Sequence, residues 1–181
     1  MKFKKVYLVN TFGTDGNLIA INYIGDGGEV IIPDEIEFNG IMYPVTDIDR
    51  AFNNNQTITS LTMSNNITVI GSQGLAGIAN LKNIKLSNKL TTIGESAFYG
   101  CQSLEEIEIP STVTTIEGHA FEGCPKLTEI YIPNSVIEMG DYVFDDFSRT
   151  IYCQVASQPS TWSYYWNSLQ DNVIWGYIKT E

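Results

Sequence analysis

The sequence repeats itself with a period of 23 residues. The clearest copies are SAFYGCQSLEEIEIPSTVTTIE, which begins at Ser96, and HAFEGCPKLTEIYIPNSVIEMG, which begins at His119, and weaker copies lie on both sides. Self-similarity at such a period is typical of a solenoid, in which each copy forms one coil and stacks on the next. The repeat therefore predicts a molecule whose core is shared between neighbouring coils.

Each copy contains the pattern LxxIxI, in which the last two apolar positions alternate with polar ones. This alternation indicates a β-strand with one buried face. Stacked coils would place these strands side by side as a parallel ladder with a spacing of about 4.8 Å and one continuous ribbon of core. The residues of the pattern are Ile58, Leu61, Met63, Leu81, Ile84, Leu86, Leu104, Ile107, Ile109, Leu127, Ile130 and Ile132.

Aligning the copies gives columns of equivalent residues, one from each repeat. Three of these columns have a structural interpretation in addition to the strand pattern. Two are apolar and predict core, and the third holds residue types that tolerate a positive φ, as expected where a single helical turn ends. The first core column is Phe52, Leu75, Phe98, Phe121 and Phe144, and the second is Val45, Ile67, Leu90, Val113 and Val136. The turn column is Asn54, Gly77, Gly100, Gly123 and Asp146.

The combination of an AFxxC segment, a LxxIxIP strand and a following VTxIG stretch resembles the leucine-rich repeats of the BspA-like family. AFYGC at 97–101 and AFEGC at 120–124 are the best copies, whereas AFNNN at 51–55 and GLAGI at 74–78 depart from the pattern. The resemblance covers residues 30–153. It implies an α/β repeat solenoid, a right-handed leucine-rich-repeat coil of about five repeats.

The segments outside the repeats predict caps. VYLVNTF and NLIAINYI, joined by GTDGN, predict an N-terminal β-hairpin cap within residues 1–29. The stretch from Gly25 to Ile48 is interpreted as a degenerate opening coil, with Val30 to Ile32 as its strand and Pro33 as its end. GTDGN and GDGGE are interpreted as plain turns rather than calcium sites, because they offer too few ligands.

Residues 154–181 are assigned to a C-terminal cap. Trp162, Tyr165, Trp166 and Leu169 fall at i, i+3, i+4 and i+7, which predicts a short helix, and the run from Val173 to Trp175 predicts a closing strand. The aromatic residues most simply seal the last coil. The alternative is that Trp162 and Trp166 form an exposed platform on which a sugar stacks.

Composition excludes several classes of partner. The formal net charge of −11 argues against nucleic acid and against an anionic membrane surface, since both are bound through an excess of Lys and Arg. No run of eighteen apolar residues occurs, so we expect no membrane insertion. The opening MKFKKVYLVNTFG has too short an apolar run to predict a signal peptide.

No constellation of catalytic or metal-binding residues is present. Cys101 and Cys124 share a column with Asn55, Ile78 and Phe147, which indicates core; buried free thiols and a disulfide between adjacent coils both remain open. His119 is the single histidine and falls in a variable turn column. We therefore expect no catalytic residues, no metal site and no cofactor.

The outward side of the predicted strands is the candidate binding surface, as the resemblance to leucine-rich repeats implies. Its residues are Ser60, Thr62, Asn83, Lys85, Glu106, Glu108, Glu129 and Tyr131. The same residues could simply stabilise the sheet through lateral pairs such as Lys85 and Glu108.

Two functions follow as hypotheses. The first is a non-enzymatic module that binds a protein or a glycan, and the second is a structural or assembly repeat of a larger surface protein with no ligand of its own. The resemblance implies a bacterial extracellular or cell-surface location and a role in adhesion.

Overall fold

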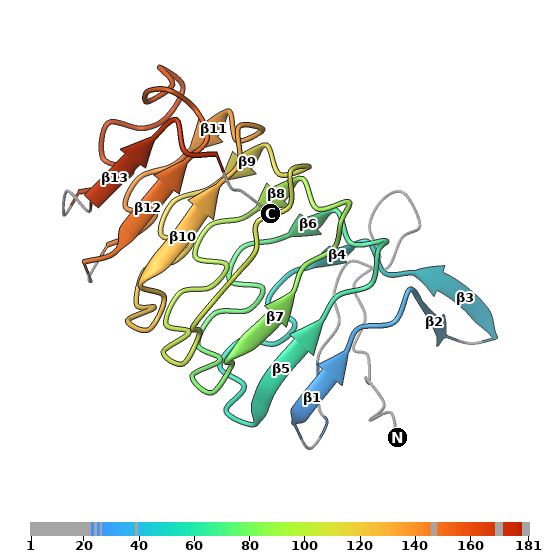
Figure 1. Ribbon diagram of the computed structural model, residues 1–181. Helices are drawn as coiled ribbons and strands as arrows, with labels where there is room; N and C mark the ends of the chain where they lie inside the picture. Colours follow the sequence, from blue (N-terminus) through green and yellow to red (C-terminus); the bar gives the residue numbers. More distant parts are fainter. Residues whose placement is uncertain are drawn as a thin grey trace.

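The computed structural model describes residues 23, 25, 27–38, 40–145, 148–168 and 172–178. These residues form a solenoid in which two rows of parallel strands run along opposite sides of a shared core (Figure 1). The longer strands make one row, called here the strand face. They are β1 (Gly28–Ile31), β5 (Ile58–Thr62), β7 (Asn83–Lys85), β10 (Glu129–Ile132), β12 (Thr150–Cys153) and β13 (Asn172–Trp175).

The second row is a five-stranded parallel sheet of two-residue strands in the order β11-β9-β8-β6-β4. Each strand pairs with its counterpart in the next coil, as Ile70 does with Ile93 and Ile93 with Ile116. The strands are β4 (Asp47–Ile48), β6 (Val69–Ile70), β8 (Thr92–Ile93), β9 (Thr115–Ile116) and β11 (Glu138–Met139).

The predicted core columns are confirmed. Every member of the column from Phe52 to Phe144 and of the column from Val45 to Val136 is at most 1% exposed. Successive rings stack, with centroids 5.2 Å apart for Phe98 and Phe121 and 5.6 Å apart for Phe121 and Phe144. Equivalent residues of successive repeats therefore contact each other in adjacent coils.

The cysteines are buried free thiols, which decides between the two interpretations left open by the sequence. The thiol of Cys101 donates a hydrogen bond to the Leu75 carbonyl at 3.3 Å, and that of Cys124 donates to the Phe98 carbonyl at 3.2 Å. Each thiol thus satisfies a backbone acceptor in the preceding coil.

The turn column has the predicted backbone: Asn54, Gly77, Gly100 and Gly123 all have positive φ. Asp146, the last member of that column, lies outside the described residues. A second left-handed column was not predicted. Its members, with φ between 50° and 57°, are Arg50, Gln73, Ser96, His119 and Tyr142.

The predicted α-helical components are wrong for the part of the chain that the structure describes, which contains no α-helix. Residues 164–168 form a turn, and Trp162 makes a parallel bridge with Met139. Backbone hydrogen bonds explain the difference: Ser163 donates to the Met139 carbonyl, and the Trp166 carbonyl accepts from Val143. The segment is a further coil of the solenoid, in which Trp162 continues the column of Ile93, Ile116 and Met139.

The N-terminal end differs from the prediction in one element. β1 pairs in parallel with β5, as expected for an opening coil, but an antiparallel hairpin of β2 (Glu35–Phe38) and β3 (Ile41–Pro44) follows it. The signal for that hairpin is the Asn39-Gly40 pair between two alternating runs. The hairpin predicted between residues 6 and 24 lies outside the described residues, apart from Tyr23, whose N–H donates to the Ala51 carbonyl.

Both ladders continue past residue 153, through β13 on the strand face and through the bridge at Trp162 on the other side. Among the residues that the structure describes, none belongs to a helix that could span a lipid bilayer.

Candidate binding site on the strand face

The strand face is divided into two three-stranded sheets, β1-β5-β7 and β10-β12-β13. Between them, the segment from Leu104 to Ile109 was predicted to form a strand, but it contributes only an isolated bridge between Glu106 and Asn83. Ile107 and Ile109 remain 6% exposed and keep their places in the core. The core ribbon is therefore continuous, as predicted, whereas the prediction of an unbroken strand ladder is wrong.

The interruption coincides with a charge conflict. In the repeat register, Glu106 would lie directly opposite Glu129, whereas the neighbouring steps of the same column place Glu106 against Asn83 and Glu129 against Thr150. Like charges directly opposite each other destabilise strand pairing. The ladder is thus weakest at the step where two carboxylates would meet at a strand spacing of about 4.8 Å.

A hollow with a cavity volume of about 960 Å³ lies over this interruption. Residues from the coils on both sides of the break line it. Six of the eight residues predicted for the binding surface belong to the lining: Asn83, Lys85, Glu106, Glu108, Glu129 and Tyr131. The remaining two, Ser60 and Thr62, lie on β5 and are not part of it.

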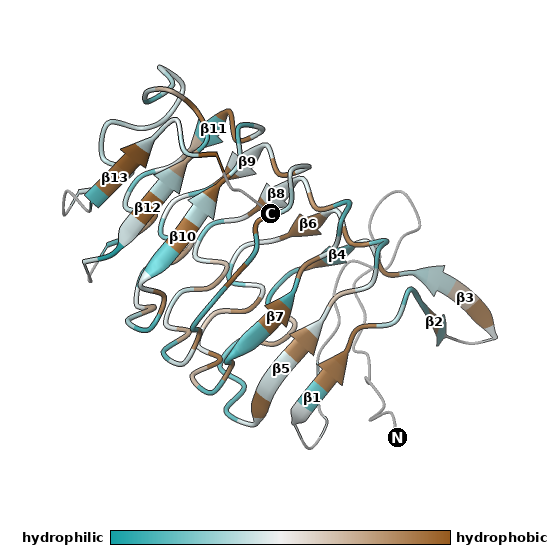
Figure 2. Cartoon of the chain, viewed as in Figure 1, coloured by the Kyte–Doolittle hydropathy of each residue, from teal (hydrophilic) through white to brown (hydrophobic). Residues whose placement is uncertain are grey.

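One part of the lining of the hollow is acidic. It consists of Glu105, Glu106, Glu108 and Glu129, and all four side chains are exposed to solvent. Glu105 also forms an ion pair with Lys126 at 3.6 Å. Figure 2 shows hydrophilic residues at the start of both β7 and β10, the two strands that border the interruption.

The lining also has an aromatic part, which consists of Tyr131, Tyr152 and Tyr177 and meets the acidic part on β10, where Tyr131 follows Glu129. Tyr131 and Tyr152 are opposite one another in the β10–β12 pairing, and their rings stack with centroids 4.7 Å apart and planes 10° from parallel. Tyr177 is tilted against both, at 5.4 Å from Tyr131 and 4.8 Å from Tyr152. We call these three residues the tyrosine cluster.

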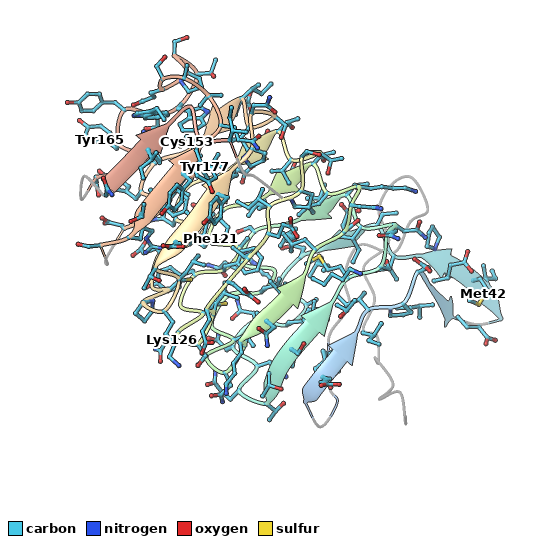
Figure 3. All side chains as sticks on the ribbon, in the orientation of Figure 1. Met42, Phe121, Lys126, Cys153, Tyr165 and Tyr177 are labelled. Atoms are coloured by element: carbon cyan, nitrogen blue, oxygen red, sulfur yellow. The ribbon has the colours of Figure 1, made fainter. Side chains whose placement is uncertain are left out.

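Tyr177 reaches the cluster because the chain turns back after β13. Gly176 has a φ of 68°, and Tyr177 donates its N–H to the Cys153 carbonyl at 3.0 Å. Figure 3 labels Tyr177 on the strand face and Tyr165 at the outer C-terminal end. The sequence could have indicated Tyr152, which follows the last strand pattern, but Tyr177 had no signal because its place depends on that turn.

The hydroxyl of Tyr131 lies in an environment that disfavours its ionised form. Partial desolvation raises its pKa, and the nearby Glu129 carboxylate raises it further. The raised pKa keeps the Tyr131 hydroxyl a neutral hydrogen-bonding group at neutral pH.

Trp162 and Trp166 are each only 3% exposed, which removes them as a sugar-stacking platform. The indole of Trp162 donates to the Val136 carbonyl at 3.2 Å, and the two rings pack edge to face with centroids 5.2 Å apart. Trp166 also packs against Phe144, the last ring of the phenylalanine column. These tryptophans seal the last coil, which is the interpretation that competed with the platform.

No group of three or more His, Cys, Asp or Glu side chains could hold a metal ion in the described ranges. His119 is half-buried, hydrogen-bonded to Glu122 and stacked on Tyr142. Its surroundings are those of a structural turn residue.

Comparison with known families agrees with the geometry of the coils. The model of the BspA type leucine rich repeat region, in six copies, matches residues 44–165. The chain belongs to the BspA-type leucine-rich repeat family. The sixth copy reaches the segment around Trp162, where the structure shows a further coil in place of the predicted helix.

Solved structures show the same fold. A leucine rich repeat protein of T. pallidum is 26% identical with a TM-score of 0.72, and the alignment covers 81% of this chain and 68% of that protein. A leucine-rich repeat protein of Bacteroides ovatus is 23% identical with a TM-score of 0.70, over 90% of this chain and 41% of its own length. A leucine-rich repeat protein of Bacteroides capillosus is 27% identical with a TM-score of 0.56, and the alignment covers 75% of this chain and 88% of that protein. No curated protein matches this chain.

Proposed function

We propose that this BspA-type repeat protein is a non-enzymatic binding module that holds a protein or glycan ligand in the hollow of its strand face. The observation that carries the proposal is the coincidence of two independent features. The outward positions of the strands were selected from the repeat alone, and six of them line one hollow with an acidic and an aromatic part. A cavity of this size with a few convergent polar groups is a typical ligand site.

Family membership supports a location on the bacterial surface or outside the cell, and a role in contact with other molecules there. Protease treatment of intact producing cells tests the location. Loss of the protein from unbroken cells is the expected result, and its full protection would contradict a surface location.

A binding screen tests the function. We would probe immobilised matrix proteins and glycans with the purified chain and with a triple variant, Glu106→Ala, Glu108→Ala and Tyr131→Ala. The matched control, Glu95→Ala, Glu138→Ala and Tyr165→Ala, changes the same residue types at exposed positions outside the hollow. We expect a ligand that the first variant loses and the control retains.

A structural or assembly repeat is the second candidate. It is favoured by the edge strand β13, which in the described part of the chain pairs only with β12 and carries the exposed Ile174. An open strand edge can pair with a further strand. A screen without any ligand, together with binding of the chain to other segments of its own protein, would support this function over the first.

A further inference from the structure

The lining of the hollow carries a net negative charge. Four glutamates and one cation, Lys85, belong to it, so the formal sum is +1 − 4 = −3. The whole chain, at −11, adds a field of the same sign. A concave surface lined by one sign of charge concentrates ligands of the opposite sign.

The glutamates lie at a place where a bound cation would stabilise the fold. Glu106 and Glu129 occupy facing positions across the interruption. The segment Leu104–Ile109 does not pair with β10. A positive group between the two carboxylates would offset the repulsion between them. Charge-assisted hydrogen bonds to carboxylates are also about twice as strong as neutral ones.

The tyrosine cluster completes a site for such a group. Phenol rings attract cations over their faces through the ring quadrupole, and Arg makes such contacts more often than Lys. Tyr131 and Tyr152 stack on each other, so one face of each ring contacts the other ring and not the solvent. A guanidinium would therefore contact the cluster over a ring face outside this stack.

We infer that the occupant of the hollow is an extended, arginine-rich polypeptide segment, held by the acidic part of the lining and the tyrosine cluster. This inference rests on the proposed binding function and narrows its ligand to a cationic polypeptide. The volume of about 960 Å³ accommodates a few side chains rather than a folded domain. Guanidinium groups would contact Glu106 and Glu129, and the peptide backbone would lie along the interrupted ladder.

The test compares two labelled peptides of equal length, one with four arginines separated by Gly and Ser and the other with citrulline at each arginine. Citrulline replaces the guanidinium with a neutral ureido group of nearly the same shape. Binding to the full chain is measured by fluorescence anisotropy. We expect the arginine peptide to bind at least about tenfold more tightly than the citrulline peptide.

Two isosteric triple variants separate a site from general attraction to an acidic protein. The first carries Glu106→Gln, Glu108→Gln and Glu129→Gln, and the control carries Glu95→Gln, Glu117→Gln and Glu138→Gln, so both lose the same charge. We expect about a tenfold loss in the first and less than about twofold in the control. Equal losses in both would overturn the inference.

The outcomes also distinguish this inference from the proposed function. A variant with Tyr131→Leu and Tyr152→Leu keeps every charge of the hollow. If the two peptides bind alike and this variant abolishes a protein or glycan hit, the hollow is a binding site but its ligand is not cationic. If the hollow variants change binding of neither the peptides nor any screened ligand, both the inference and the proposed function are wrong.

Discussion

At the scale of single residues, the fold overrides a backbone preference most clearly in the unpredicted column of positive φ that includes Ser96. Residues with a side chain normally avoid this left-handed conformation. Ser96 has a φ of 55°, which costs a residue with a side chain about 1 kcal/mol or more. Its N–H donates to the Gly118 carbonyl of the next coil at 2.9 Å, and Gln73 and His119 make the equivalent bonds. The inter-coil hydrogen bonds hold this conformation and offset its cost.

Ser96→Val should therefore lower the free energy of unfolding by about 1–2 kcal/mol, because a β-branched side chain fits the left-handed region worst. Ser96→Asn is the matched control and should stay within about 0.5 kcal/mol, since Asn tolerates this region. Urea unfolding measures both. Equal stability of the two variants would show that the φ of this column imposes no strain.

Buried thiols predict a dependence of stability on pH. Burial raises the pKa of the Cys153 thiol to about 12, whereas the thiol in an unfolded chain ionises near 8.5. Above pH 8.5 the unfolded chain releases a proton that the folded chain retains, so the stabilisation is present below that pH and is lost as the pH rises toward 12. Urea melts at pH 8 and about pH 10 should show a larger decrease for the native chain than for Cys153→Ala. Identical decreases would contradict a raised pKa.

At the scale of the strands, the ladder is missing at a step where two like charges would lie opposite each other. Asn83 pairs with Glu106 in an isolated bridge, and Glu129 pairs with Thr150. Glu106 and Glu129 do not pair with each other. Burial of Ile107 and Ile109 fixes the coil in the core even so. Hydrophobic stacking and backbone pairing are thus separable in one repeat.

Glu106→Gln should raise the free energy of unfolding by roughly 0.2–1 kcal/mol, since it removes the like-charge opposition without changing shape. The gain should shrink at about 0.5 M salt, where exposed charges are screened. Glu95→Gln, an exposed glutamate outside the hollow, is the control and should change stability little at either salt concentration. A gain that does not depend on salt would argue against the charge conflict.

At the scale of the whole molecule, a solenoid needs its end coils covered, because each coil otherwise exposes the core surface that a neighbour would bury. At the C-terminal end, Trp166 covers Phe144, and Trp175 packs at 6.2 Å from Trp166. At the N-terminal end, Tyr23 packs on Phe52 with ring centroids 5.6 Å apart. Aromatic side chains close both ends of the described solenoid.

Trp166→Ala should destabilise the chain by about 3–5 kcal/mol by opening a cavity at the end of the core. Because coils contact only their neighbours, hydrogen exchange should accelerate most at Tyr142 and Val143, whose N–H groups donate to this last coil, and least at the Phe98 amide. Tyr164→Ala removes an adjacent aromatic side chain that is 86% exposed and should cost less than about 0.5 kcal/mol. Uniform acceleration along the chain would show that the solenoid unfolds as one unit.

The amino-acid sequence determined the register of the coils, the two core columns and the outward positions of the strands. The repeat superimposes like residues, and a stacked fold must bury the columns that stay apolar. The predicted helix failed over residues 162–168 because Trp162 continues the column of Ile116 and Met139 and Trp166 packs on Phe144. The i, i+4 spacing of these two tryptophans also fits a helix, so the sequence could not separate the two structures without the backbone partners.

Only the tertiary structure decided which outward residues share a hollow. The position of Tyr177 depends on the left-handed turn at Gly176 and on a hydrogen bond to Cys153, neither of which has a counterpart in the repeat. The break in the ladder lies between two glutamates, Glu106 and Glu129, that are remote in sequence and become neighbours only when the coils stack. Periodicity reports what every coil has in common, whereas the candidate site arises where one coil differs from its neighbours.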